Sequence, residues 1–247
     1  MNKKAGSMAN FVKSLSIVIS FLCTNSYAEN FTPAPITDPH YTKAGFFDIH
    51  VCNWPKRKLF FMALFSTYKY DDVSKIEIYN PEDLKLGEIT TDKYKLLYQK
   101  GKPEKRVFIK QIQIQQNAIN GWYRSIITMK SGMKYEAKDY VVIANLAQAK
   151  NLTPEADSEL SKIPKKLTWN KIPGAKFYKV FIKDYWTQKT LYTSSLLNKP
   201  ELILPKGLIK KRGEYQWVIH ARDVNENVLL GDFNHGSVSK PVSFSIN

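Results

Sequence analysis

A strict alternation of side chains constrains this chain most strongly, and it is clearest in residues 215–222. One set of alternate positions is aromatic or apolar: Tyr215, Trp217, Ile219 and Ala221. The intervening set includes polar side chains: Gln216, His220 and Arg222. A period of two residues is typical of a strand that buries one face and exposes the other. The pattern therefore predicts a half-buried antiparallel strand.

Two earlier segments, residues 167–169 and 174–182, also have the composition of strands. They carry the aromatic residues Trp169 and Tyr178. Taken with residues 215–222, their order resembles a fibronectin type III-like sandwich. The resemblance covers about a third of the chain, and it implies a scaffold for contacts rather than for chemistry.

Further elements are expected within this C-terminal region. Strands are predicted at residues 189–194, 202–204 and 238–246. Residues 225–227 and 234–237 resemble the later hairpin loops of fibronectin type III-like domains.

The first half of the chain also has the composition of short strands separated by turns. Strands are expected at residues 46–54, 59–65, 74–79, 84–89, 105–115, 121–129 and 134–143. Residues 59–65 are apolar on both faces, so they form either a central strand or one covered by the neighbouring domain. The apolar phase changes between Ile109 and Ile112, which indicates a β-bulge or a bend. This pattern predicts an immunoglobulin-like antiparallel sandwich.

We therefore predict an all-β protein with two tandem antiparallel β-sandwich domains. The immunoglobulin-like domain is expected at residues 29–146 and the fibronectin type III-like domain at residues 163–247. Residues 147–162 break the strand pattern and are interpreted as a linker. Within it, Thr153, Pro154 and Glu155 resemble a helix N-cap, a first-position proline and an early acid, which predicts a short helical turn.

The N-terminal residues 1–28 have the features of a secretory signal peptide. They carry lysines but no acid, then an apolar run at residues 15–22, then the small residues Ser26 and Ala28. The run is shorter than the ~20 residues that a transmembrane helix needs. Cleavage is therefore expected near Ala28, leaving a periplasmic or secreted protein without a transmembrane span.

Cysteine usage fits an exported chain without disulfides, because Cys23 lies in the predicted signal peptide and only Cys52 remains. Lipid attachment at Cys23 is disfavoured by the bulky residues before it. Cys52 shares one face of its predicted strand with Asp48 and His50. A thiolate beside an imidazole can act as a nucleophile, so a thiol-dependent enzyme or redox protein using Cys52 and His50 is an alternative.

Motifs for catalysis or cofactor binding are missing from the sequence. It has no Gly-rich phosphate loop, no His-Glu-x-x-His motif and no Gly-x-Ser-x-Gly elbow. Residues 223–227 resemble the start of a calcium loop, but Val228 replaces the required Gly and Asn234 the bidentate acid. We therefore expect no catalytic residue, no cofactor and no metal.

The charge balance points to anionic partners. The chain has 37 Lys and Arg against 22 Asp and Glu, a net charge of +15. Only five of these basic residues are Arg, whereas a specific nucleic-acid site would be expected to use more of them. Outside the cell, such a protein attracts anionic glycans and lipid headgroups.

Basic and aromatic residues gather in three expected loops. The candidate partner-binding residues are Trp54, Lys56, Arg57, Lys58, Tyr185, Trp186, Lys210, Lys211 and Arg212. Aromatic faces stack on sugar rings, and cations suit acidic groups. The sequence thus favours an exported, non-catalytic binding or envelope-interaction module that contacts an anionic glycan, a lipid headgroup or a protein. A second alternative is a structural subunit of an envelope assembly, joined through exposed strand edges.

Overall fold

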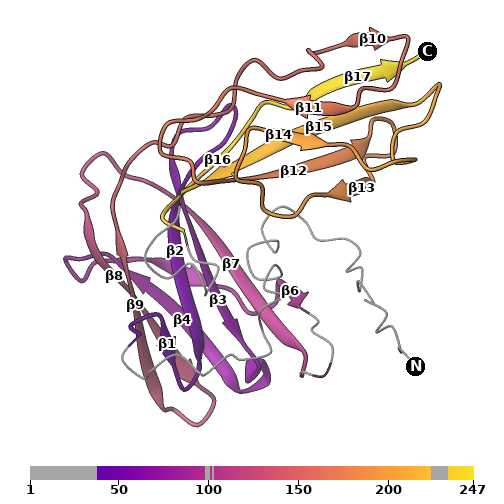
Figure 1. Cartoon of the computed structure of the whole chain (residues 1–247). Coiled ribbons are helices and arrows are strands. Elements are labelled where there is room, and N and C mark those ends of the chain that lie inside the picture. Colours follow the sequence, from indigo (N-terminus) through magenta and orange to yellow (C-terminus); the bar gives the residue numbers. More distant parts are fainter. Residues whose placement is uncertain (1–37, 98–100, 102, 224–232) are drawn as a thin grey trace, which may run out of the picture.

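The computed structural model describes residues 38–97, 101, 103–223 and 233–247, and these residues form an all-β fold (Figure 1). The one helical element among them is a single 3-10 turn, η3 (Tyr70–Asp72). The prediction of an all-β sandwich architecture is confirmed. The predicted signal peptide and the expected loop at residues 225–227 lie outside the described residues.

The first half of the chain is a sandwich of two layers. One layer contains β1 (Tyr41–Thr42), β2 (Gly45–Asn53), β3 (Phe60–Thr67), β7 (Lys105–Gln113) and β6 (Tyr94–Leu97). The other contains β5 (Lys85–Ile89), β4 (Val73–Tyr79), β8 (Gly121–Met129) and β9 (Lys134–Val141). Buried aromatic and aliphatic side chains such as Phe47, Phe65 and Ile127 fill the space between the layers. Strand β3 is central, and all of its residues are buried.

The second half is a sandwich with one small layer. Its larger layer contains β10 (Ser158–Leu160), β12 (Phe177–Asp184), β13 (Thr190–Thr193), β15 (Glu214–Arg222), β16 (His235–Val238) and β17 (Val242–Ile246). The small layer pairs β11 (Lys166–Thr168) with β14 (Glu201–Ile203). Trp217 is fully buried in this core, with the Trp169 ring centroid 6.3 Å away. The alternating positions that predicted this strand therefore face the core.

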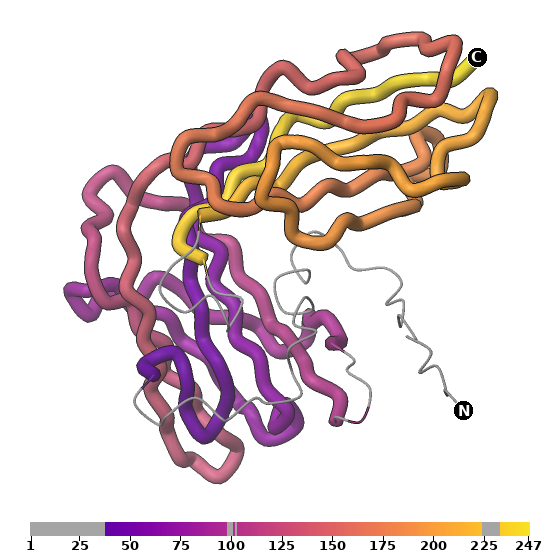
Figure 2. Tube along the Cα trace, viewed as in Figure 1, coloured from indigo at the N-terminus to yellow at the C-terminus, as the bar shows by residue number. Residues whose placement is uncertain are grey.

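Strand β16 joins the two sandwiches. It pairs antiparallel with β15 and parallel with β2, where His235 lies opposite Val51. The Val51 N–H also donates to the Asn234 carbonyl at 2.9 Å. An 11-stranded sheet consequently runs through both halves of the molecule, and the yellow tube of β16 meets the indigo tube of β2 where the halves join (Figure 2).

Hydrogen bonds at the boundary between the predicted first domain and the predicted linker reinforce the junction. Asn53 donates through Nδ2 to Asn145 Oδ1 at 2.7 Å. Ser237, on β16, donates through Oγ to the Ala147 carbonyl at 2.7 Å. Residues 145–147 therefore contact both sandwiches.

The predicted helical turn at residues 153–155 is not formed. Thr153 instead exchanges two backbone hydrogen bonds with Thr168, at 2.8 and 3.0 Å. Backbone pairing with β11 therefore overrides the local capping signal. The same predicted linker also contains β10, which pairs in parallel with β17.

Two further expectations are wrong. Strand β7 pairs with β3 without a register shift, so there is no bulge; Ile109 and Ile112 pack on opposite faces because both faces are partly covered. The expected hairpin loop at residues 234–237 is mostly strand β16. The sheets are not purely antiparallel, because β16–β2 and β10–β17 are parallel pairs.

Candidate functional site

The predicted binding residues fall in two separate regions. Residues 54–58 follow β2, whose end pairs with β16 at the junction of the sandwiches. Residues 185–186 and 210–212 lie at the opposite end of β15, where Asp184 is paired with Tyr215. The structure therefore brings together the second and third loops and separates both from the first.

The loop after β2 uses two of its predicted binding residues for packing. Trp54 is half-buried, and its ring meets Phe60 edge-on with centroids 5.2 Å apart. The Arg57 guanidinium lies 3.8 Å from the centroid of the same Phe60 ring and donates to Gln111 Oε1 at 2.9 Å. Trp54 and Arg57 thus cover the buried Phe60 side chain, which is a structural role. Lys56 and Lys58 are the other two cations of this loop, and both are exposed.

The loop before β15 presents its cations from an ordered turn. The Lys210 N–H donates to the Tyr215 hydroxyl at 2.7 Å, and Arg212 has a φ of 57°. Lys210, Lys211 and Arg212 are all exposed. Like Lys56 and Lys58, they form no ion pair with a carboxylate in the described part of the chain.

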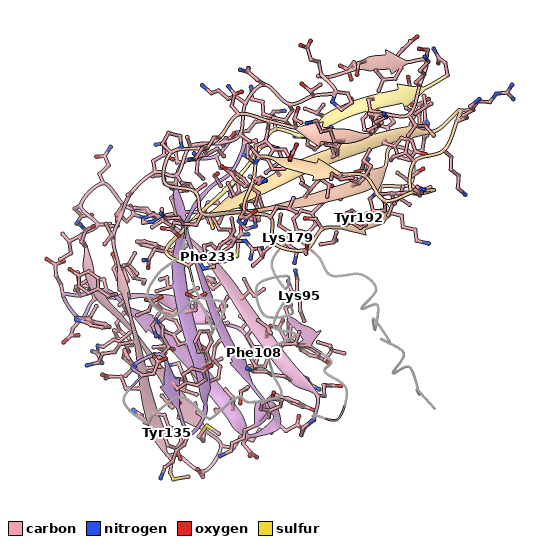
Figure 3. The ribbon with its side chains drawn as sticks, viewed as in Figure 1. Lys95, Phe108, Tyr135, Lys179, Tyr192 and Phe233 are labelled. Carbon is pink, nitrogen blue, oxygen red and sulfur yellow. The ribbon has the colours of Figure 1, made fainter. Side chains whose placement is uncertain are left out.

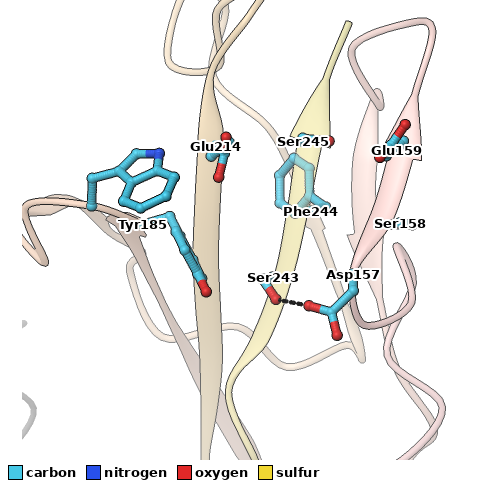
Figure 4. A pocket seen from close by; sticks show the side chains of 9 residues that line it. Asp157, Ser158, Glu159, Tyr185, Glu214, Ser243, Phe244 and Ser245 are labelled. Atoms are coloured by element: carbon cyan, nitrogen blue, oxygen red, sulfur yellow. Dashed lines mark hydrogen bonds between the residues drawn. The ribbon is translucent and has the colours of Figure 1, made fainter.

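A groove of 320 Å³ lies on the outer face of the second sandwich (Figure 4). We call it the aromatic groove, and its lining includes Asp157, Glu159, Tyr185, Trp186, Glu214 and Ser245. Two of these residues, Tyr185 and Trp186, are among the predicted binding residues. The four polar residues are not, and they come from β10, β15, β17 and the turn before β10.

Strand register aligns the lining residues. Ser245 lies opposite Glu214 on one side and opposite Glu159 on the other. The Tyr185 N–H donates to the Glu214 carbonyl at 3.0 Å and so adds Tyr185, the residue directly after β12, to the row. With strands about 4.8 Å apart, the row is about 14 Å long. It faces outward, because the alternate residue Tyr215 points into the core.

The two aromatic rings in the groove are unusually open to solvent. Trp186 is 73% exposed and Tyr185 37% exposed. Their ring centroids are 5.3 Å apart, and the ring planes are at 89° to each other. The pair therefore offers two perpendicular faces. Exposed aromatic surface of this kind is typical of interaction sites.

Cys52 and His50 do not have the properties of a nucleophile and its base. Cys52 is 1% exposed. Burial raises the pKa of its thiol well above the usual range, Asp48 raises it further, and Arg57 opposes this. Burial lowers the pKa of His50 to about 3, and the charges of Arg222 and His235 act in the same direction. A reactive thiolate needs the opposite environment, an exposed and electropositive one.

The polar side chains around His50 form a buried cluster at the junction. His220 and Arg222 are both buried, and the Phe233 ring centroid lies 4.1 Å from that of His50. Figure 3 shows Phe233 where the two sandwiches meet. Burial, followed by the charge of Arg222, also lowers the pKa of His220. These groups are therefore part of the interface between the halves.

His235 differs from the other two histidines of the junction. Burial disfavours its charged form, but hydrogen bonding to Asp223 at 2.5 Å and to the Val142 carbonyl at 2.7 Å outweighs this, so its pKa is raised.

A second groove of 540 Å³ lies beside the segment that follows the junction. Its lining includes Lys150, Glu155, Lys240 and Val242. It contains no aromatic side chain.

Within the described residues, no three His, Cys, Asp or Glu side chains are grouped closely enough to hold a metal ion. No described helix has the length and apolar character needed to cross a membrane.

Comparison with known proteins does not assign the chain to a family. No protein-family model and no curated protein matches it. Among solved structures, it is similar to a point mutant of Salmonella alpha-2-macroglobulin, at 12% identity and a TM-score of 0.26, over 85% of this chain and 15% of that one. The methylamine-reacted form of that protein gives 12% identity and a TM-score of 0.24, over 82% and 15%. The chain thus spans about 15% of the length of these structures.

Proposed function

We propose that this protein is an exported, non-catalytic binding module that contacts an anionic component of the cell envelope. In this proposal, an immunoglobulin-like and a fibronectin type III-like sandwich are displayed in the periplasm or outside the cell after removal of the signal peptide. The partner is an anionic glycan, a lipid headgroup or an acidic protein. The proposal rests mainly on the exposed cations of the two basic loops.

Those cations contrast with the paired lysines of the first sandwich. Lys75 and Lys85 both contact Glu77, at 2.7 and 2.6 Å. Lys56 and Lys58 have no such carboxylate among the described residues, and the same is true of residues 210–212. Cations without internal partners remain available to an external anion. Because they are exposed, their attraction is screened over about 10 Å at 0.1 M salt.

The test is a binding assay with a defined polyanion and with vesicles that contain anionic lipid. The Lys56→Glu/Lys58→Glu and Lys210→Glu/Lys211→Glu variants are compared with the natural protein. We expect each to weaken binding about tenfold at low salt, and less at high salt. The preference for polyanion or vesicles identifies the class of partner.

A matched control carries the same charge change elsewhere. Lys134 and Lys162 are exposed lysines outside both loops, and their double reversal to Glu alters the net charge equally. If this control loses as much affinity as the loop variants, binding depends on net charge alone and the role of the loops is refuted.

A further inference from the structure

The aromatic groove is acidic although the protein as a whole carries a net charge of +15. Three carboxylates line it, those of Asp157, Glu159 and Glu214. None of the three forms an ion pair with a described Lys, Arg or His. Asp157 accepts a hydrogen bond from the Ser243 hydroxyl, drawn in Figure 4. The groove therefore repels the anionic partners proposed for the basic loops.

We propose that the aromatic groove binds a small organic cation through an alkylammonium group, with a quaternary ammonium as the best fit. The faces of Trp and Tyr rings attract such cations, and nearby carboxylates supply the opposite charge. At 320 Å³, the groove is at the lower end of the ~300–1,000 Å³ typical of small-ligand sites. The lining includes none of the basic residues 56–58 and 210–212, although residues 210–212 lie at the same end of β15. The inference does not depend on the function proposed for those loops.

The geometry assigns separate roles to the lining residues. The perpendicular rings of Tyr185 and Trp186 form a corner that contacts the methyl groups of the cation on two sides. Glu214 is held beside this corner by the hydrogen bond from the Tyr185 N–H to its carbonyl. Glu159 lies two strands away, about 10 Å across the row, and contributes longer-range attraction.

A second aromatic pair in the first sandwich provides a natural control. Trp122 and Tyr140 lie opposite each other on β8 and β9, with ring centroids 5.3 Å apart and planes at 77°. Trp122 is 49% exposed. The next pair on the same face is Arg124 and Lys138, and both are ion-paired, Arg124 with Asp83 and Glu136 and Lys138 with Glu136. The aromatic geometry is thus similar, whereas the charges beside this pair are neutralised by ion pairs within the chain.

The experiment titrates choline into the purified protein by calorimetry, beside dimethylbutanol, its uncharged carbon isostere. We expect choline to bind about tenfold more tightly than the isostere. Trp186→Ala should abolish the binding of choline, and Glu159→Gln/Glu214→Gln should weaken it about tenfold. Trp122→Ala should leave it unchanged. Because all these side chains are on the outer faces, thermal unfolding of each variant should match that of the natural protein.

Three results would overturn the proposal. One is equal binding of choline and dimethylbutanol, which would reveal a merely apolar surface. The second is a lack of choline binding, and the third is choline binding that survives Trp186→Ala. A neutral oligosaccharide that needs Trp186, while choline does not bind, would identify a sugar site instead. Phosphatidylcholine vesicles, run in parallel, distinguish a lipid headgroup from a free ligand as the source of the ammonium group.

Discussion

The two sandwiches share one continuous sheet, but the charged side chains on their outer faces differ in whether they form ion pairs. On the first, Glu77 is bound by two lysines, and Arg124 bridges Asp83 at 2.8 Å and Glu136 at 3.2 Å. On the second, the carboxylates of the aromatic groove have no cation from the described chain. The same architecture thus carries one face whose charges neutralise each other and one whose charges are open to a ligand.

The comparison shows why net charge alone is a poor guide to the partner. Hydrogen bonds from Lys75 and Lys85 lower the pKa of Glu77 to about 2. On that face, Lys75, Lys85 and Arg124 are paired with carboxylates of the same chain. The excess positive charge can therefore attract an anionic partner only where the cations lack carboxylate neighbours. A groove lined by carboxylates can be present on the same protein.

The largest expected effect tests whether the two halves form one cooperative unit. Trp217→Ala removes the fully buried indole of the second core and should lower the free energy of unfolding by about 3–5 kcal/mol. Because β16 hydrogen-bonds to both halves, we expect a single denaturant transition that shifts as a whole. Two separate transitions, with the first half unaffected, would mean that the halves are energetically independent. Trp186→Ala is the control and should leave the transition in place.

A smaller effect is expected at the junction itself. A Cβ at Gly236 would lie 2.7 Å from His220 Nε2 and 2.8 Å from Phe233 Cε2, too close for either neighbour. Gly236→Ala should therefore cost about 1–3 kcal/mol of unfolding free energy. At Gly87, in β5, the nearest atom would be Lys110 Cε at 3.8 Å, so Gly87→Ala serves as the control. Equal stability of the two variants would show that the junction is not tightly packed.

Lowering the pH should destabilise the junction between the sandwiches before it breaks the ion pairs on the outer face of the first sandwich. The pKa of His50 in the folded protein is about 3, below the ordinary 6.5. Its contribution to stability is therefore complete above pH 6.5 and is lost as the pH falls toward 3, because the unfolded chain takes up the proton first. The loss is about 1.4 kcal/mol per pH unit. His220 acts in the same direction, whereas the raised pKa of His235 opposes it near neutrality.

The measurement is the free energy of unfolding at several values between about pH 7 and pH 5, above the range in which most carboxylates titrate. His50→Asn should flatten the slope by about one proton. An unchanged slope would mean that His50 is protonated in the folded state.

The smallest effect compares the two outer faces directly. Glu77→Gln breaks the contacts to two lysines and should cost less than about 1 kcal/mol, because surface ion pairs contribute little. Glu214→Gln removes a carboxylate without a described cation and should cost nothing in thermal stability. A clear loss in the second variant alone would show that Glu214 is structural, and the contrast between the faces would disappear.

Local alternation was sufficient to predict the long strands but not how they assemble. Tyr215 and Trp217 predict β15 because a half-buried strand needs this period. Strand β16 has the sequence His-Gly-Ser-Val, which carries no such signal. It is extended because β15 and β2 both supply hydrogen-bond partners, and those partners are distant in sequence.

The residues of the candidate site also divide into those that the local sequence predicts and those that depend on distant strand pairing. Tyr185 and Trp186 could be predicted from an aromatic pair in a hairpin loop. Glu159 and Ser245 could not, because they meet only through the parallel register of β10 and β17. Arg57 was predicted to bind a partner, but its position over Phe60 depends on how the loop after β2 folds back.

The parallel pairing of β2 with β16 has a consequence for biosynthesis. Val51 is made early and His235 late, so nearly the whole polypeptide must leave the ribosome before these strands can meet. Until then, the β2 edge lacks its neighbour, and an unpaired edge invites association with other chains. A polypeptide translocated unfolded and completed on the far side of a membrane would avoid that hazard, whereas a prematurely terminated product would retain the bare edge and be a natural target for proteolysis.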